Sequence, residues 1–280
     1  MATVAMNNGV KIPFVGIGTY LIEPKDAEVS VREALKMGYR LIDTANVYRN
    51  ERAVGRGIKA SGVKREEIFL STKLWPSEYE NPNAIKETLE RLGLDYIDLL
   101  FLHQPSGNYI AGYKQLEKAY KEGIIKSIGI SNFEGKYIEE ILEKCEIKPQ
   151  VIQVECHPYY VQEELRKVID PENIKLMSWF PLGQGDKNLI NEPVFKELGE
   201  KYHKTSAQII LKWHTQMGFL VIPGSKNVDH IRDNFNLFDF ELTPEDMEKI
   251  AKINKHKRYF TRTEELLKQF AEFKPTYETA

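Results

Sequence analysis

Cysteine, long apolar runs and an excess of either charge are all scarce in this sequence, and each absence excludes a class of protein. The 280 residues include only two cysteines, Cys145 and Cys156, which form no CxxC pair and predict reduced thiols rather than a disulfide framework. No apolar run approaches the roughly 20 residues of a membrane helix, so we expect no membrane partner. Lys and Arg number 39 against 41 Asp and Glu, which argues against a nucleic-acid partner because such surfaces are strongly basic.

Targeting and metal-binding patterns are absent as well. Met1 is not followed by a basic region and an apolar stretch, so we expect no secretory signal and a cytoplasmic protein. Cys156 and His157 are adjacent, but neighbouring side chains on a strand point apart, so no metal site is expected. No linker or low-complexity tract divides the chain. We therefore expect one domain, residues 1–280, acting as a monomer.

Apolar strands alternate with amphipathic helices from end to end of the chain. Asn8-Gly9 predicts a turn inside an amino-terminal β-hairpin over 3–12. Eight strand–helix units follow, and they favour a closed α/β fold, the (β/α)8 TIM barrel, over an open doubly wound sheet. Extra helices are expected after strand 7, at 193–202 and 205–217, and near the carboxyl terminus, at 228–236 and 244–253. The conformation of the charged stretch 258–280 is left open, with a place beside the barrel mouth available to it. The strands are expected at 14–18, 40–43, 68–73, 96–103, 125–131, 151–154, 174–179 and 219–222, and the main helices between them at 26–37, 83–92, 111–121, 135–144 and 162–168.

Two glycine patterns resemble a dinucleotide-binding turn without its context. Residues 55–60 match Gly-x-Gly-x-x-Ala, but they lie late in a helical pattern that begins near Asn50-Glu51. Residues 16–18 read Gly-Ile-Gly, but no helix opens directly behind them. Because the Rossmann fingerprint needs a strand before it and a helix after it, neither match predicts that fold.

Polar or aromatic residues end nearly every predicted strand. In a β/α barrel the carboxyl ends of the strands meet at one mouth, where functional groups gather. A barrel that served only as a scaffold would not need such a ring. The residues at or just beyond the strand ends are Thr19, Asp43, Lys73, His103, Ser131, Asn132, Gln153, Trp179, Ser225 and Lys226.

Asp43, Lys73 and His103 end three consecutive strands, and Tyr48 follows in the loop after Asp43. An isolated tyrosine, with a pKa of about 10, is a poor proton donor at neutral pH. We expect the Lys73 ammonium to lower that pKa and Asp43 to keep Lys73 charged and aimed, while His103 orients a substrate carbonyl or takes part in proton transfer. Each residue alone has an ordinary explanation, such as a helix cap, a solvated lysine or a core aromatic. Their shared register favours a site that protonates an oxygen.

At these residues the sequence resembles the aldo-keto reductases over nearly the whole chain, and is similar to bacterial diketogluconate and methylglyoxal reductases. Ordered matches with suitable spacing are specific, whereas any one of them alone would be weak. The matching segments are 38–45 with Tyr48 and Asn50-Glu51, 70–74, 95–99 through His103, 128–133, Gln153 with 155–158, and Trp179 with 181–183.

The resemblance implies NAD(P)H-dependent reduction of aldehydes and ketones by a catalytic tetrad of Asp43, Tyr48, Lys73 and His103, with Tyr48 as the general acid. It implies that Ser131, Asn132 and Gln153 hold the nicotinamide carboxamide and that Trp179 stacks on the ring. Further cofactor contacts are implied at Gly18, Thr19, Tyr20, Asp43, Leu182, Gly183, Ser225, Lys226, Asn227, His230 and Asn234.

The sequence departs from the family pattern at two places. Gly224 and His230 stand where many relatives carry Lys and Arg, residues that suit a ribose 2′-phosphate. Lys226 can supply that charge, so NADPH is favoured, with NADH or dual use left open. Gln104-Pro105 follows His103 where some relatives place an aromatic residue. We expect small-molecule carbonyl substrates to contact Tyr20, Trp75 and His103, with Tyr109 as a further wall; small aldehydes, α-dicarbonyls such as methylglyoxal, and keto-sugars are all compatible.

Two other functions fit the same fold. An aldolase-type barrel would use Lys73 in a Schiff base, although Asp43 beside Lys73 favours the ammonium and opposes that role. A nicotinamide-binding regulatory subunit is the second alternative, because a fold does not fix a function. The intact tetrad weighs against it.

Overall fold

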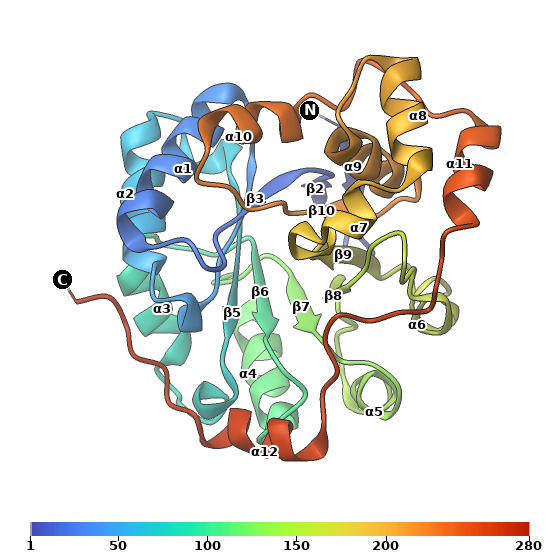
Figure 1. Ribbon diagram of the computed structural model, residues 1–280. Coiled ribbons are helices and arrows are strands. Elements are labelled where there is room, and N and C mark those ends of the chain that lie inside the picture. Colours follow the sequence, from blue (N-terminus) through green and yellow to red (C-terminus); the bar gives the residue numbers. More distant parts are fainter. Residues whose placement is uncertain (1, 280) are drawn as a thin grey trace.

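The centre of the molecule is a ring of eight parallel strands, which Figure 1 shows as a computed structural model with residues 2–279 described. The strands lie in chain order around the ring. The ring closes where Val15 bridges Val221 in parallel and the Val221 amide donates to the Phe14 carbonyl at 2.9 Å. The predicted (β/α)8 barrel is confirmed. Its strands are β3 (Gly16–Gly18), β4 (Leu41–Asp43), β5 (Phe69–Leu74), β6 (Leu99–Leu102), β7 (Ile128–Ser131), β8 (Val151–Glu155), β9 (Lys175–Trp179) and β10 (Leu220–Val221).

Helices surround this ring, including the extra pair predicted after the seventh barrel strand. The first helix starts two residues before the predicted position because Pro24, with its fixed φ, occupies the first turn. Thr205 and Gln208 form a reciprocal capping box at the start of α9. Within residues 2–279, no helix combines the length and the apolar composition needed to cross a membrane. The helices are α1 (Pro24–Met37), α2 (Glu51–Ser61), α3 (Ala84–Leu92), α4 (Tyr109–Lys121), α5 (Lys136–Lys144), α6 (Glu163–Ile169), α7 (Lys187–Ile190), α8 (Pro193–Tyr202), α9 (Ser206–Gln216), α10 (Val228–Phe235), α11 (Pro244–Ala251) and α12 (Glu264–Glu272), with single 3-10 turns η1 (Asn46–Tyr48), η2 (Arg65–Glu67), η3 (Pro76–Glu78) and η4 (Gly183–Gly185).

The predicted amino-terminal hairpin is present and covers one end of the barrel. Strands β1 (Thr3–Ala5) and β2 (Lys11–Pro13) pair antiparallel, and Gly9 at the turn has φ 83°, which glycine adopts without strain. Met6 and Ile12 are buried in one cluster with side chains from inside the barrel, among them Leu41 and Phe101. The hairpin therefore plugs the end of the barrel opposite the strand carboxyl ends.

The interior of the barrel changes from apolar to polar along each strand. Side chains on a strand alternate between two faces, so residues two apart share a face. The interior residues Leu41 and Phe101 are each followed two positions later by a polar residue, Asp43 and His103. Gly129 leaves room for this packing, since a Cβ there would lie 2.3 Å from the Phe101 ring. The same alternation that builds the core delivers polar groups to the mouth.

The carboxyl-terminal segment, left open by the sequence, runs past the mouth of the barrel (Figure 1). It contains α12, which packs against η3. Beyond α12, the carboxylate of Glu278 accepts the Ala53 amide at 3.0 Å and pairs with Arg56 at 2.8 Å. The end of the described chain is thereby fastened to α2.

Candidate active site

Asp43 and Lys73 form a buried ion pair at the base of the mouth. Lys73 Nζ lies 2.6 Å from Asp43 Oδ2 and donates to the Thr44 carbonyl at 2.8 Å. Asp43 Oδ1 accepts hydrogen bonds from Ser71 Oγ at 2.8 Å and Gln153 Nε2 at 3.0 Å. Burial lowers the pKa of Lys73, and the Asp43 carboxylate opposes that shift. The pair is held from both sides, so its geometry is set before a substrate arrives.

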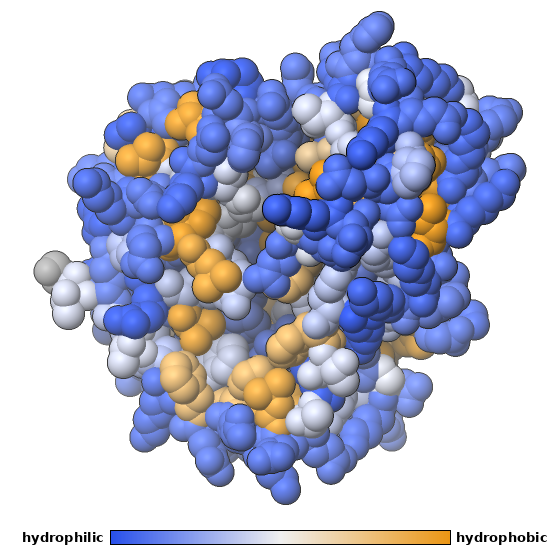
Figure 2. Space-filling model, in the orientation of Figure 1, coloured by the Kyte–Doolittle hydropathy of each residue, from blue (hydrophilic) through white to orange (hydrophobic). Residues whose placement is uncertain are grey.

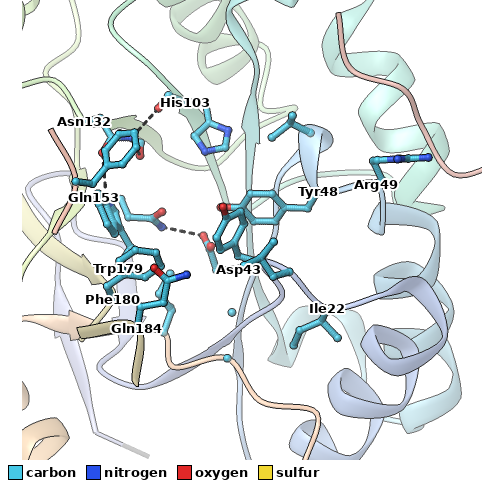
Figure 3. Close-up of a pocket in the computed structure, with 18 of the residues that line it drawn as sticks. Ile22, Asp43, Tyr48, Arg49, His103, Asn132, Gln153, Trp179, Phe180 and Gln184 are labelled. Atoms are coloured by element: carbon cyan, nitrogen blue, oxygen red, sulfur yellow. Dashed lines mark hydrogen bonds between the residues drawn. The ribbon is translucent and has the colours of Figure 1, made fainter. Parts of the chain in front are cut away.

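Tyr48 stands beside this pair, in the turn that follows β4. The centroid of its ring lies 4.9 Å from Lys73 Nζ and 5.7 Å from the centroid of the His103 ring. Figure 3 shows Tyr48 beside Asp43, with His103 facing the same space. Burial raises the pKa of Tyr48 well above its ordinary value, and Asp43 and Tyr20 add to the rise. The prediction of a net lowering of this pKa is wrong, because desolvation outweighs the attraction between the tyrosinate and Lys73, which Asp43 already engages.

His103 follows β6 and lies edge-on to Trp75, with 5.1 Å between ring centroids. Burial, followed by the charge of Lys73, lowers the pKa of His103 well below its ordinary value. The imidazole is therefore neutral at neutral pH. Its Nδ1 has no hydrogen-bond partner within residues 2–279. A neutral imidazole can donate one hydrogen bond to a carbonyl oxygen without competing with Tyr48 as the acid.

These groups open into a cavity of about 1220 Å³, visible as the hollow on the face shown in Figure 2, with hydrophobic residues along its rim. Lys73 itself does not line the cavity and lies behind Asp43 and Tyr48. Trp179 lines it and donates from Nε1 to Asn132 Oδ1 at 2.9 Å. The predicted site residues that line it are Gly18, Tyr20, Asp43, Tyr48, Trp75, His103, Ser131, Asn132, Gln153, Trp179 and Leu182.

Ser131, Asn132 and Gln153 leave polar atoms suited to a carboxamide. Asn132 keeps only the second lone pair of Oδ1, since its Nδ2 donates to the His103 carbonyl and to Ser131 Oγ, each at 3.1 Å, and its Oδ1 accepts one hydrogen bond from Trp179. Within residues 2–279, Gln153 Oε1 accepts no hydrogen bond and the Ser131 hydroxyl donates none. One free acceptor and one free donor match the NH₂ and C=O of a nicotinamide carboxamide. The residues present therefore fit the nicotinamide end of the cofactor.

Comparison with known proteins agrees with this geometry. The model of the aldo/keto reductase family matches residues 15–255. The chain belongs to the aldo-keto reductase family. It is 45% identical over 270 residues to the glyoxal reductase of Bacillus subtilis, covering 95% of this chain and 97% of the relative. It is 36% identical to the methylglyoxal reductase DkgA of Escherichia coli, covering 91% and 94%.

Solved structures give the same assignment. An aldo-keto reductase from a Medee basin deep-sea metagenome library has a TM-score of 0.90 at 39% identity, covering 93% of this chain and 98% of that one. An aldo/keto reductase from Brucella melitensis has a TM-score of 0.86 at 40% identity, covering 90% and 99%. The protein is thus an oxidoreductase of a family that uses nicotinamide cofactors, and it reduces small-molecule carbonyl compounds.

In this aldo-keto reductase, the residues predicted for the adenosine end lie outside the cavity lining. The lining continues through Pro223 and Gly224 toward the start of α10, where Asn227 Oδ1 accepts the Asp229 amide at 2.9 Å. The amino end of a helix after the last barrel strand is a frequent phosphate site. Most of these residues are exposed there, but Asn234 is buried. The predicted residues of this group are Ser225, Lys226, Asn227, His230 and Asn234.

Close backbone packing explains the departure at Gly224. A Cβ on Gly224 would lie 2.8 Å from the Gly18 carbonyl oxygen, and a Cβ on Gly18 would lie 2.6 Å from the Ile222 carbonyl oxygen. The ends of β3 and β10 therefore approach each other through two glycines. A lysine at 224, the residue that the family resemblance leads one to expect, would require this backbone to shift.

Three further predicted residues do not line the cavity. The Thr19 hydroxyl is buried and contacts the Asp43 carbonyl and Asn50 Oδ1. Gly183, with φ 59°, packs against Leu189 and Tyr259 behind the wall. Tyr109 begins α4, lies against Phe133 and Tyr137 and does not line the cavity, so its prediction as a substrate wall is wrong.

A second set of residues lines the cavity without having been predicted from the sequence. Arg49 and Phe180 directly follow predicted site residues, Tyr48 and Trp179, and both have positive φ angles, 61° and 53°. This adjacency in the sequence could have indicated that Arg49 and Phe180 line the cavity. The other missed residues belong to segments whose sequence pattern does not predict a place in the cavity. The missed lining residues include Arg49, Phe180, Gln184, Phe260, Leu266, Phe270 and Tyr277.

Proposed function

We propose that this protein reduces aldehydes and ketones to alcohols with NAD(P)H, using Tyr48 as the general acid. The position of Tyr48 carries the proposal: it lines the cavity beside Lys73 and His103, and its raised pKa keeps the hydroxyl protonated at neutral pH. The nicotinamide, when bound, supplies the hydride. Ser131 and Gln153 would hold its carboxamide and Trp179 would face its ring.

The other three tetrad residues prepare Tyr48 for proton transfer. As negative charge develops on the carbonyl oxygen, Tyr48 gives up its proton to that oxygen. The Lys73 ammonium, 4.9 Å from the ring, stabilises the tyrosinate that remains, and Asp43 fixes the ammonium in place. Neutral His103 orients the carbonyl oxygen by one hydrogen bond. These steps need no movement of the buried pair.

Small aldehydes and α-dicarbonyls are the substrates we propose. Relatives at 45% and 36% identity are named for reduction of glyoxal and methylglyoxal. Around the tetrad the wall is largely aromatic, with Tyr20 5.1 Å from Tyr48 between ring centroids and Trp75 beside His103. Such a wall favours compact, weakly polar carbonyl compounds over charged ones.

The test is a carbonyl panel assayed with wild type and Tyr48→Phe. Phenylalanine keeps the ring but removes the proton, so turnover is expected to fall about 10²–10⁴-fold, the usual scale of general acid catalysis. Cofactor affinity, measured by fluorescence titration, should stay near the wild-type value because the hydroxyl is not placed among the carboxamide contacts. Wild-type turnover in Tyr48→Phe would exclude the proposed role. Tight cofactor binding without turnover of any carbonyl would favour the regulatory-subunit alternative.

For the cofactor we propose NADPH, with NADH or dual use as the alternative outcome. Lys226 is exposed just before α10, whereas Arg232 is paired with Asp229 at 2.7 Å. Lys226→Ala should therefore weaken the binding of NADPH more than that of NADH. The expected loss of NADPH affinity is up to about tenfold, the scale of one exposed charge–phosphate contact. Parallel titrations with both cofactors measure this, and an equal loss for both would remove Lys226 from the phosphate site.

The Schiff-base alternative has little support in the geometry. Lys73 is 0% exposed, does not line the cavity, and already donates to Asp43 and Thr44. A substrate carbonyl would have to displace both contacts to reach its nitrogen. Borohydride trapping of a substrate on Lys73 would revive that alternative.

A further inference from the structure

A short segment between α11 and α12, residues 258–262, crosses the mouth of the barrel and is held by two glutamates. We call it the 258–262 strap. Glu134, just after β7, pairs with Arg262 at 2.6 Å and also with Arg258. Glu155, the last residue of β8, contacts the backbone between these arginines. Two neighbouring barrel strands thus each supply one carboxylate to the same five residues.

Glu155 is the more deeply buried of the two carboxylates, at 1% exposed. Its Oε1 accepts the Tyr259 amide at 2.6 Å and its Oε2 accepts the Phe260 amide at 3.2 Å. His157 Nε2 lies 3.0 Å from Oε1. Backbone amides removed from water need an acceptor, and a carboxylate makes stronger hydrogen bonds to them than a neutral group does. Glu155 therefore fixes two consecutive backbone positions.

The pleat of β8 explains why this carboxylate points toward the strap. Val151, Gln153 and Glu155 are two residues apart and share the interior face of the strand. Val151 packs inside the barrel and Gln153 reaches Asp43. Glu155, one step nearer the mouth, reaches the strap. Gln153 and the segment 155–158, which the sequence analysis grouped, thus place the proposed cofactor contact and the strap contact on one strand.

Phe260 connects the strap to the reaction space. It lines the cavity, and its ring lies edge-on to Trp179 with 6.3 Å between centroids. We propose that Glu155 is a positioning residue for substrate specificity. It acts by holding Phe260 in place as a fixed wall on which carbonyl substrates that extend beyond the reacting centre can pack. This inference rests on the proposed carbonyl reduction. Glyoxal-sized substrates would not reach that wall, whereas aromatic aldehydes would.

The test uses Glu155→Gln, with Glu139→Gln, an exposed change on α5, as the matched control. A glutamine keeps the shape but loses the charge and one of the two acceptors. In Glu155→Gln, KM for an aromatic aldehyde should rise about tenfold, the scale of losing one apolar wall contact, while kcat and the KM for methylglyoxal stay near wild type. In a Phe260→Ala background, adding Glu155→Gln should change the aromatic KM little, since the wall is already gone.

Limited digestion with trypsin gives a readout that does not depend on activity. Arg258 and Arg262 are cleavage sites inside the strap. Loss of a charge-assisted acceptor should increase local opening and speed cleavage at these sites about tenfold or more, with Glu139→Gln cleaved as wild type. Unchanged cleavage and unchanged KM would overturn the inference, as would a KM effect that persists in full without Phe260. If wild type reduces no carbonyl compound, the proposed function fails while digestion still reports on the strap.

Discussion

The Asp43–Lys73 pair shows, for single residues, how a buried charge is tolerated near a reaction space. Each side chain is nearly inaccessible to solvent, and their charged atoms are 2.6 Å apart. Ser71, Gln153 and the Thr44 carbonyl satisfy the remaining hydrogen-bonding positions. Removing one partner would strand the other as an unpaired charge, which costs more than the intact pair contributes.

We therefore expect Lys73→Met to destabilise the fold as well as abolish turnover. The free energy of unfolding should fall by about 3–5 kcal/mol, the usual cost of leaving one partner of a buried pair alone. Adding Asp43→Leu should restore part of that loss, because the stranded carboxylate is removed, without restoring turnover. Urea unfolding followed by circular dichroism measures both variants. A double variant less stable than Lys73→Met would show that the pair is not coupled as described.

The residue types and their positions at the strand ends predicted which residues form this site. They did not predict how the pKa values of those residues are shifted. Asp43, Lys73 and His103 could be placed together because each ends a neighbouring parallel strand. The direction of the Tyr48 pKa shift could not be derived, because it depends on how completely Asp43 engages the ammonium and how dry the hydroxyl is. Both are properties of the packed site.

Among whole elements, the strands were the most predictable part of the chain and the carboxyl-terminal segment the least. Strands such as β6, buried at all four positions and composed only of Leu and Phe, produce apolar runs that can be recognised directly. The segment after α11 is charged, and its contacts are with Glu134, Glu155 and η3, all far away in sequence. Only the closed barrel brings those partners within reach, so Phe260 could not be assigned to the cavity in advance.

The hairpin of β1 and β2 offers an element-scale test, since it lies at the opposite end of the barrel from the tetrad. Ile12 is 0% exposed and packs into the barrel interior. Ile12→Ala should lower the free energy of unfolding by about 2–5 kcal/mol by creating a cavity, while kcat measured well below the melting temperature stays near wild type. Val4→Ala, a partly buried change on β1, is the matched control and should cost less. A large loss of kcat in folded Ile12→Ala would show that the plug and the mouth are coupled.

For the molecule as a whole, buried histidines make stability depend on pH. His214 in α9 is 0% exposed, with Nδ1 2.8 Å from the Ile210 carbonyl oxygen and Nε2 3.2 Å from that of Cys156. Burial lowers the pKa of His214 to about 4, and the pKa of His103 is lowered in the same direction. The folded state thus holds both rings neutral, whereas the unfolded chain protonates them near the ordinary value of about 6.5. The single-domain organisation, the monomeric state and the cytoplasmic location stay predictions.

Stability should accordingly be complete above about pH 6.5 and be lost as the pH falls toward 4, because the unfolded chain binds more protons in that interval. From pH 7 to pH 5, His214 alone should account for a fall of about 2 kcal/mol in the free energy of unfolding. His214→Gln removes this titration, so urea unfolding at both pH values should show a smaller difference than in wild type, even though the variant is less stable at pH 7. His203→Asn, an exposed change at the end of α8, should keep the wild-type difference. An equal pH dependence in His214→Gln and wild type would mean that the folded protein accommodates a charged imidazole at this position.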